Sequence, residues 1–269
     1  MNLNYTWIQW MFFFHFYCFF GWCFESTYVS IKEKKPVNRG FMRGPFLPLY
    51  GTGALMMLIV SAPFQENLLL TYIAGCIGAT VLEYVTGVVM EALFKVRYWD
   101  YSDQPFNFQG YICLGSSLAW GILTILMTRF VHQPIENFVL AIPEGILTAV
   151  TMVISLVIVV DFTISFKAAM DLRDVLVAME EARKEMQRLQ KRVDVMIAVS
   201  EQAKEEWKQE RETKAELLAG RIEEKLNLFH KKNLQFRAIL KGNPTLRSEK
   251  FKEALEELKM TLEEHKKKQ

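Results

Sequence analysis

Charge is distributed so unevenly along this chain that it limits the possible folds more than any other feature. Residues 1–170 contain 9 lysines and arginines and 10 acidic residues, whereas residues 171–269 contain 23 and 20. An apolar half is thus joined to a tail in which nearly every second residue is charged. We expect a transmembrane helix bundle over residues 1–165 and a cytoplasmic helical tail over residues 166–269. Because acids and bases alternate in the tail, it forms no basic patch, and we expect no nucleic-acid partner.

Five apolar stretches have about the length that a membrane helix needs. A helix rises about 1.5 Å per residue, and the hydrocarbon core of a bilayer is about 30 Å thick. The fold class that we expect is therefore all-α, a polytopic membrane bundle of about five spans followed by the tail. No charged segment precedes the first span, so it should be retained rather than cleaved as a signal peptide. The five expected spans are Tyr5–Val29, Pro48–Pro63, Leu68–Phe94, Tyr111–Val131 and Phe138–Asp161.

Basic residues in the loops predict the orientation. The positive-inside rule places loops rich in lysine and arginine on the cytoplasmic side. We expect the chain to lie in the cell membrane with its N-terminus outside. Five spans would then place the tail in the cytoplasm. The loops in question follow the first and third spans and carry Lys32, Lys34, Lys35, Arg39 and Arg43, and Lys95 and Arg97, respectively.

The tail has the pattern of long helices. No glycine or proline occurs between Gly145 and Gly220, so the fifth span should continue into the tail as one helix. Apolar or small residues recur at three-four spacing from Leu172 to Met196, which is typical of a coiled coil. Gly242-Asn243-Pro244 should produce one sharp reversal. Methionine and alanine at core positions specify oligomeric state poorly, so both a hairpin packed on itself and a homo-oligomeric coiled coil remain open.

The stretch 38–51 interrupts the apolar half with two arginines, three glycines and two prolines. Proline removes a backbone donor and glycine is costly within a helix, so we expect a structured loop here. Near a bilayer, non-helical backbone is tolerated only where protein or water satisfies its amides. The loop should therefore line a cavity or pack into the bundle.

The loops after the first and third spans also resemble each other. Eleven residues separate Gly40 from Gly51, and eleven separate Gly110 from Gly121. We hypothesise a parallel repeat of two helical hairpins, related by an axis along the membrane normal. The matching segments are Glu25, Asn38-Arg39-Gly40-Phe41, Gly44 and Tyr50-Gly51 in the first hairpin, and Glu91, Asn107-Phe108-Gln109-Gly110-Tyr111, Gly115 and Trp120-Gly121 in the second.

Glu83 is the sharpest candidate for a functional residue. A charge inside a span costs about 2.5 to 3.5 kcal/mol on insertion scales, so it should face a partner, a proton or a water-filled cavity. We expect Arg39 and Arg43 to be the counter-charges of Glu25, and Asp100 to cap a turn or pair with an arginine of the first loop. The alternative is that such pairs merely hold the bundle together. The candidate polar cluster consists of Glu25, Asn38, Arg39, Arg43, Glu83, Glu91, Asp100, Asn107 and Glu144.

Other common functional motifs are absent from the sequence. It has no Gly-x-x-x-x-Gly-Lys-Ser/Thr phosphate loop, no His-Glu-x-x-His and no Gly-x-Ser-x-Gly. The cysteines have no histidine at ligand spacing and no Cys-x-x-Cys pair, so we expect them to pack as small core residues. We expect no catalytic residue, metal or cofactor, and no ATP hydrolysis by a phosphate loop. The four cysteines are Cys18, Cys23, Cys76 and Cys113.

The combined motifs of residues 5–165 resemble the bacterial family of putative ABC transporter permeases, the so-called type IV group, common in Gram-positive bacteria. The resemblance implies a membrane subunit of unknown substrate that needs a separate ATPase, and it supplies no catalytic residues. The alternatives are a membrane sensor or scaffold that recruits partners or dimerises through its coiled coil, and an enzyme on lipid head groups with Glu25 and Glu83 as acid and base. The resemblance rests on Asn38-Arg-Gly-Phe, Gly44-Pro45, Pro48-x-Tyr50-Gly51, Leu82-Glu83-Tyr84, Glu91, Trp99-Asp100-Tyr101, Phe106-Asn107 and Gly110-x-Ile112-Cys113-Leu114.

Overall fold

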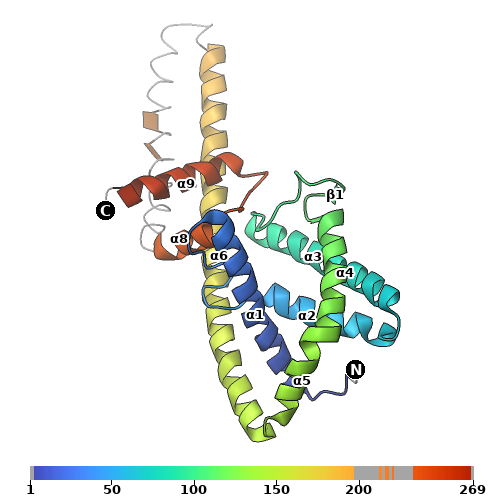
Figure 1. Cartoon of the computed structure of the whole chain (residues 1–269). Helices are drawn as coiled ribbons and strands as arrows, with labels where there is room; N and C mark the ends of the chain where they lie inside the picture. The colour runs from blue at the N-terminus through green and yellow to red at the C-terminus, as the bar shows by residue number, and fades with distance from the viewer. Residues whose placement is uncertain (1–2, 197–211, 214–215, 218–219, 221–232, 268–269) are drawn as a thin grey trace. The chain divides into compact units, whose positions relative to one another are not determined.

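The structure is a computed structural model that describes residues 3–196, 212–213, 216–217, 220 and 233–267 (Figure 1). The described chain is mostly helical, as expected, with one short antiparallel hairpin in which Asn107 pairs with Cys113 and Phe108 with Ile112. The elements are α1 (Trp7–Glu33), α2 (Pro48–Ser61), η1 (Ala62–Phe64), α3 (Leu68–Phe94), β1 (Asn107–Phe108), β2 (Ile112–Cys113), α4 (Leu114–Leu126), η2 (Met127–Val131), α5 (His132–Ala141), α6 (Glu144–Met196), α8 (Asn233–Gly242) and α9 (Lys252–Lys267).

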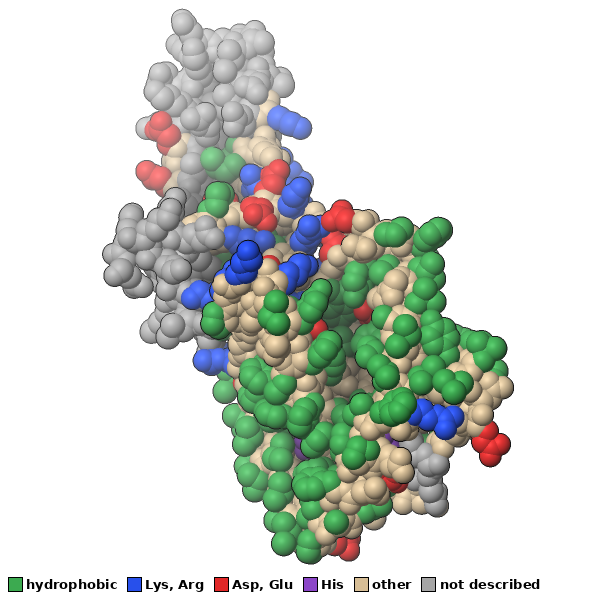
Figure 2. Space-filling view, in the orientation of Figure 1, with side chains coloured by type: hydrophobic (Ala, Val, Ile, Leu, Met, Phe, Trp, Pro, Cys, Tyr) green, Lys and Arg blue, Asp and Glu red, His purple; other side chains and the backbone are tan. Residues whose placement is uncertain are grey.

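Three helical stretches of the described chain are long and apolar enough to cross a membrane. They are Leu68–Phe94, Leu114–Ala141 and Glu144–Leu189, and the shorter Pro48–Phe64 is also apolar. Large apolar side chains on these helices are exposed, such as Ile77, Val153 and Leu156, and hydrophobic side chains dominate the face of the bundle seen in Figure 2. Exposed apolar surface of this extent fits a membrane protein. Membrane crossing by α1 and α2 remains a prediction.

The predicted boundary between the fourth and fifth spans was wrong. We expected the fourth span to end at Val131 and the fifth to begin at Phe138, but the helix continues through the π-turn η2 into α5. The chain turns at Ile142, which is extended with φ −77° and ψ 130°, directly before Pro143. A residue before proline is pushed out of helical geometry by the proline ring, so the break falls here. Pro134 is instead held near the start of α5.

A hydrophobic core joins the N-terminal helices to α5 and the start of α6. It contains Phe13 and Tyr17 of α1, Leu58 of α2 and Val139 of α5. The buried His132 packs edge-on against Phe13, with ring centroids 5.1 Å apart. Its two ring nitrogens are hydrogen-bonded to the hydroxyls of Tyr5 and Tyr17, at 3.0 and 2.7 Å. Because both nitrogens have partners, His132 is explained as a structural residue.

The chain divides into two compact units, and α6 contributes to both. The first comprises residues 1–93, 97–167 and 238–247, and the second comprises residues 94–96, 168–237 and 248–269. In the second unit an ion pair of 2.5 Å joins Arg183 of α6 to Glu253 of α9. The predicted helix break is confirmed, because α8 ends at Gly242 and α9 begins at Lys252, whereas the reversal of chain direction remains a prediction. The coiled coil remains a prediction, and its residues 197–211 lie outside the described chain.

Candidate functional site

The loop between α1 and α2 is non-helical from Lys34, where α1 is capped, to Leu47, and Pro48 begins α2. Helix α2 thus begins at Pro48, where the second apolar stretch was expected to begin, because proline is well suited to the first position of a helix. The last four residues of the stretch 38–51 are therefore helical. The backbone amides of the loop are satisfied by side chains of α6. The amide of Gly44 donates to Asp161 Oδ2 at 2.9 Å, and the amide of Arg43 donates to Ser165 Oγ at 3.2 Å. The loop is thus packed into the bundle, as such backbone requires.

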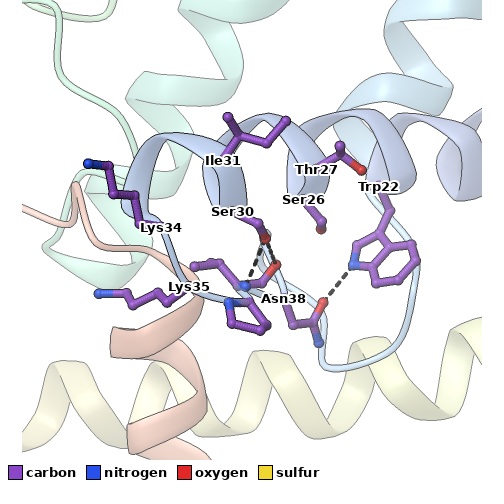
Figure 3. A pocket seen from close by; sticks show the side chains of 10 residues that line it. Trp22, Ser26, Thr27, Ser30, Ile31, Lys34, Lys35 and Asn38 are labelled. Carbon is purple, nitrogen blue, oxygen red and sulfur yellow. Dashed lines mark hydrogen bonds between the residues drawn. The ribbon is translucent and has the colours of Figure 1, made fainter.

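Asn38 shapes this loop from within. Its side-chain oxygen accepts a hydrogen bond of 2.5 Å from the Trp22 indole, and its amide group donates to the carbonyl oxygen of Arg43 at 2.6 Å. Figure 3 shows Trp22 and Asn38 at a pocket of about 810 Å³ at the C-terminal end of α1. Ser30 Oγ accepts from the amide of Val37 at 2.9 Å and closes the same turn. The role of Asn38 is therefore to hold the conformation of this loop.

Glu25 of α1 is held by a cation and a hydroxyl. Arg39 Nε lies 3.5 Å from Glu25 Oε1, and the Tyr50 hydroxyl donates to Glu25 Oε2 at 2.6 Å. The structure thus provides one of the two expected counter-charges. Arg43 does not serve as the other, since its side chain is exposed and forms no ion pair with any described residue. The contribution of Arg43 is made by its backbone.

Glu83 lies in the middle of α3 and is 5% exposed. It accepts three hydrogen bonds, from the Tyr101 hydroxyl to Oε1 at 3.0 Å, and from Ser116 Oγ and Trp120 Nε1 to Oε2 at 3.2 and 3.0 Å. All three donors are neutral. Within the described residues, no lysine, arginine or histidine pairs with this carboxylate. Glu83 is therefore a buried acid whose charge, when present, is balanced by hydrogen bonds alone.

Tyr101 lies near both carboxylates. Burial raises the pKa of its hydroxyl, and the negative charges of Glu83 and Glu25 raise it further. Tyr50 is also within electrostatic reach of Tyr101. Tyr101 thus donates a hydrogen bond to one acid, Glu83, and its pKa is also raised by the charge of a second acid, Glu25, on another helix. We call these residues, with Arg39 and Trp120, the carboxylate cluster: Glu25, Arg39, Tyr50, Glu83, Tyr101 and Trp120.

The contacts of two glycines support the internal repeat. A Cβ at Gly51 of α2 would overlap the Cys18 sulfur and lie 2.8 Å from Phe14 of α1. A Cβ at Gly121 of α4 would likewise overlap the sulfur of Cys76 and the ring of Tyr72, both on α3. In each hairpin the aromatic residue stands four positions before the cysteine. The second helix of each hairpin therefore approaches the first at the same place.

The matching contacts of Gly51 and Gly121 change the alignment of the two hairpins that we expected from the sequence. Glu25 follows Cys18 by seven residues, and Glu83 follows Cys76 by seven. Glu25 accepts a hydrogen bond from Tyr50, the residue before the close-packed glycine of α2, and Glu83 accepts one from Trp120, the residue before that of α4. The counterpart of Glu25 is therefore Glu83, and the expected match with Glu91 was wrong. Sequence comparison missed this because the connecting loop is longer in the second hairpin.

Glu91 and Asp100 hold the buried Arg97. Glu91 Oε2 lies 2.5 Å from Arg97 Nε and accepts from the Tyr111 hydroxyl at 2.6 Å, and Asp100 Oδ1 lies 3.8 Å from Arg97 Nη1. One of the two expected roles of Asp100 is observed, because its Oδ1 caps a turn by accepting from the amide of Ser102 at 3.0 Å. The arginines that pair with it are Arg97 and Arg247, and not an arginine of the first loop. Burial alone would raise the pKa of Asp100, but hydrogen bonds from Ser102 and the two guanidinium groups outweigh it and lower the pKa below its ordinary value.

The two remaining candidates lie apart from the carboxylate cluster. The Asn107 amide group donates to the carbonyl oxygens of Ser102 and Gln104, and its oxygen accepts from the amide of Gly110, so it folds its own loop. Glu144 is exposed at the first position of α6, beyond Pro143. Neither residue contributes to the site.

Residues 243–247 bind the loops of both hairpins, and the sequence did not indicate this. We call this segment the tail clamp. Thr245 Oγ1 donates to the carbonyl oxygen of Tyr98 at 3.1 Å, and the backbones of Arg247 and Arg97 exchange two hydrogen bonds of 2.7 and 3.1 Å. Asn243 binds Arg39 and the carbonyl oxygen of Gly40. The available signal, Gly242-Asn243-Pro244, predicted a helix end and a reversal of the chain but no contact with these loops.

Comparison with known proteins identifies a family for most of the membrane half. The model of the family described as "Putative ABC-transporter type IV" matches residues 12–166. No curated protein and no solved structure matches the chain. The matched range includes every member of the carboxylate cluster and excludes the tail clamp.

Proposed function

The chain belongs to the putative ABC-transporter type IV family, and on that premise we propose that it is the permease subunit of a transporter, working with an ATPase on a separate chain. Its apolar helices support a membrane location, and its sequence has no phosphate loop of its own. The substrate is not defined by the family. The further support for transport therefore has to come from the site.

The carboxylate cluster is the observation that carries this proposal. Glu25 and Glu83 occupy matching places in two hairpins, and Tyr101, which donates a hydrogen bond to Glu83, also has its pKa raised by the charge of Glu25. In transporters built from repeats, substrate and ion sites lie at the interface between the repeats. Ionisable residues within spans mark such pathways because their burial is costly without a function. A solute or ion that binds here would meet carboxylate and phenol oxygens, which suits a cationic group.

Arg39 divides the cluster into two unequal halves. Its Nε lies 3.5 Å from Glu25, so the negative charge of Glu25 is balanced. The same guanidinium group donates to the Tyr98 carbonyl oxygen at 3.3 Å and so links Glu25 to the loop of the second hairpin. Glu83 has no such partner among the described residues. A transported cation would therefore be attracted to Glu83, and Arg39 would limit the total negative charge of the path.

The experiment compares solute distribution in four strains of the native host: wild type, a deletion of this chain, Glu83→Gln and Glu144→Gln. Solutes inside and outside the cells are profiled by mass spectrometry. The proposal predicts that a solute displaced by the deletion is equally displaced by Glu83→Gln, while Glu144→Gln matches wild type and all variants accumulate in the membrane. A Glu83→Gln strain that matches wild type, with a clear deletion phenotype, would contradict it.

One observation favours a second candidate, a membrane-anchored scaffold. Helix α6 runs for 53 residues without interruption, from the membrane half into the charged tail. A helix of this length suits a rod that recruits partners or dimerises through a coiled coil. A truncation that removes residues 248–269 but keeps the tail clamp separates the two readings. A scaffold would lose its partners and keep solute profiles unchanged, whereas a permease would show altered profiles only if coupling needs the tail.

A further inference from the structure

We propose that the carboxyl group of Glu83 is a proton-binding site, which alternates between ionised and neutral forms within an otherwise unchanged network. The role of this site in the protein rests on the proposed transport function, but proton binding by Glu83 can be measured without transport. It follows from a difference between the two hairpins and from the hydrogen-bonding capacity of Ser116.

The two hairpins differ in the residue that precedes the loop glycine. Gly40 and Gly110 both have positive φ, of 127° and 72°, and occupy matching places in their loops. Arg39 precedes the first glycine and pairs with Glu25. Gln109 precedes the second, and its side-chain oxygen accepts a hydrogen bond of 3.1 Å from the Tyr84 hydroxyl. The second hairpin thus has an amide where the first has a permanent cation, and Glu83 lacks the compensation that Glu25 has.

Ser116 allows the network to satisfy both forms of Glu83. Its hydroxyl lies 3.2 Å from Glu83 Oε2 and 3.0 Å from the Cys113 carbonyl oxygen, and its oxygen accepts from the Cys113 amide at 3.3 Å. A hydroxyl has one proton to donate and two lone pairs. With Glu83 ionised, Ser116 donates to Oε2. With Glu83 neutral, the new O–H on Oε2 donates to Ser116 Oγ, and the serine proton turns to the Cys113 carbonyl oxygen.

The other two donors serve both forms without change. Trp120 Nε1 can donate only, and it faces Oε2 at 3.0 Å, while the Tyr101 hydroxyl faces Oε1 at 3.0 Å. Each oxygen of a carboxyl group retains acceptor capacity after one proton is bound. Binding of a proton to Glu83 therefore removes one negative charge and leaves no buried donor or acceptor without a hydrogen bond. Networks that are fully satisfied in both states avoid the cost of an unpaired buried group.

The groups around Glu83 also favour a proton over a permanent counter-ion. Helix α4 contributes Ser116 and Trp120, the loop contributes Tyr101, and β2 contributes the Cys113 backbone, none of them a cation. The other charged groups of the cluster, Glu25 and Arg39, pair with each other at 3.5 Å. A buried carboxyl group with no cationic partner avoids the cost of a buried charge by binding a proton.

Infrared difference spectroscopy of the purified full chain in lipid nanodiscs tests this directly. Spectra are recorded between about pH 5 and about pH 9, a range that brackets most shifted carboxyl groups. We expect a C=O band of a neutral, hydrogen-bonded carboxyl group in wild type, its complete loss in Glu83→Gln, and its retention in Glu91→Gln, where the missing acid is the partner of Arg97. Elution as a single folded species is checked for each variant.

A second variant guards against a trivial loss of folding. Ser116→Ala keeps the carboxyl group but removes the acceptor of its proton, so the band should remain and move to higher frequency. A merely structural Glu83 would give no titrating band at any pH. That result, or a band that survives in Glu83→Gln, would overturn the proposal. No ATPase or solute is present in this assay, so its failure leaves the permease function standing, and a failure of the transport test leaves proton binding standing.

Discussion

The Asn243 side chain accepts a hydrogen bond of 2.9 Å from the guanidinium of Arg39, across 204 residues of sequence. The same asparagine donates to the carbonyl oxygens of Gly40 and Ile239, at 3.0 and 2.9 Å. Arg39 is in turn the cation that compensates Glu25. The tail clamp therefore helps to hold Arg39 in the position where it balances the charge of Glu25 in the carboxylate cluster.

Replacing Asn243 by alanine should destabilise the loop between α1 and α2. Asn243 is 2% exposed, and its removal leaves the Gly40 carbonyl oxygen and an Arg39 N–H without their protein partner. Losing one partner of a buried hydrogen bond costs about 1 to 3 kcal/mol. We expect a lower thermal midpoint for Asn243→Ala in detergent. Lys241→Ala, an exposed change two residues earlier, is the matched control, and equal midpoints for the two variants would contradict the role of the clamp.

Asp100 should contribute stability that depends on pH. Its pKa is lowered in the folded chain, so its contribution is fully present above the unfolded pKa of about 3.9 and is lost as the pH falls through the folded pKa. Asp100→Asn should therefore lower the thermal midpoint at neutral pH, and the difference from wild type should shrink below about pH 4.

The control for this experiment is Asp103→Asn. Asp103 also pairs with Arg247, at 3.2 Å, but its side chain is 78% exposed. Exposed ion pairs contribute about 0 to 1 kcal/mol, so the control should change little. A difference between Asp100→Asn and wild type that stays constant with pH would show that Asp100 acts by packing alone.

The repeat predicts that Gly51 and Gly121 respond alike to substitution. Alanine at either position would overlap a cysteine sulfur on the facing helix, and at Gly51 also the Phe14 carbonyl oxygen, 2.8 Å away. We expect both variants to lower the yield of folded protein. Gly53→Ala, two residues along the same helix, meets nothing within 4 Å and should be neutral or slightly stabilising, because alanine favours a helix by about 1 kcal/mol. A tolerated Gly121→Ala beside a damaging Gly51→Ala would contradict the proposed register.

Much of the helical architecture could be predicted because apolar runs and proline positions are local signals. Leu68–Phe94 was predicted to its ends, and the long helix through residues 145–196 followed from the absence of glycine and proline. The turn at Pro143 was missed because the break was expected between Val131 and Phe138, where the helix instead continues through a π-turn. Local signals thus located the helices better than the turns between them.

The candidate site could be predicted only in part. An acid inside an apolar span identifies Glu83 without any structure. Its donors Tyr101, Ser116 and Trp120 are 18 to 37 residues away in sequence and are ordinary residues of their segments, so only the fold reveals them. The contact of Asn243 with Arg39 likewise depends on how the chain returns to the bundle.

The most direct test of the central claim, that this chain is a permease subunit, is the composition of the complex that it forms in its own membrane. The chain would be isolated from native membranes in a mild detergent, and the intact complex weighed and its components identified by mass spectrometry. The account predicts a second chain with a phosphate-loop ATPase sequence in a fixed ratio to this one. A complex that contains only copies of this chain would contradict it and would favour the membrane-anchored scaffold.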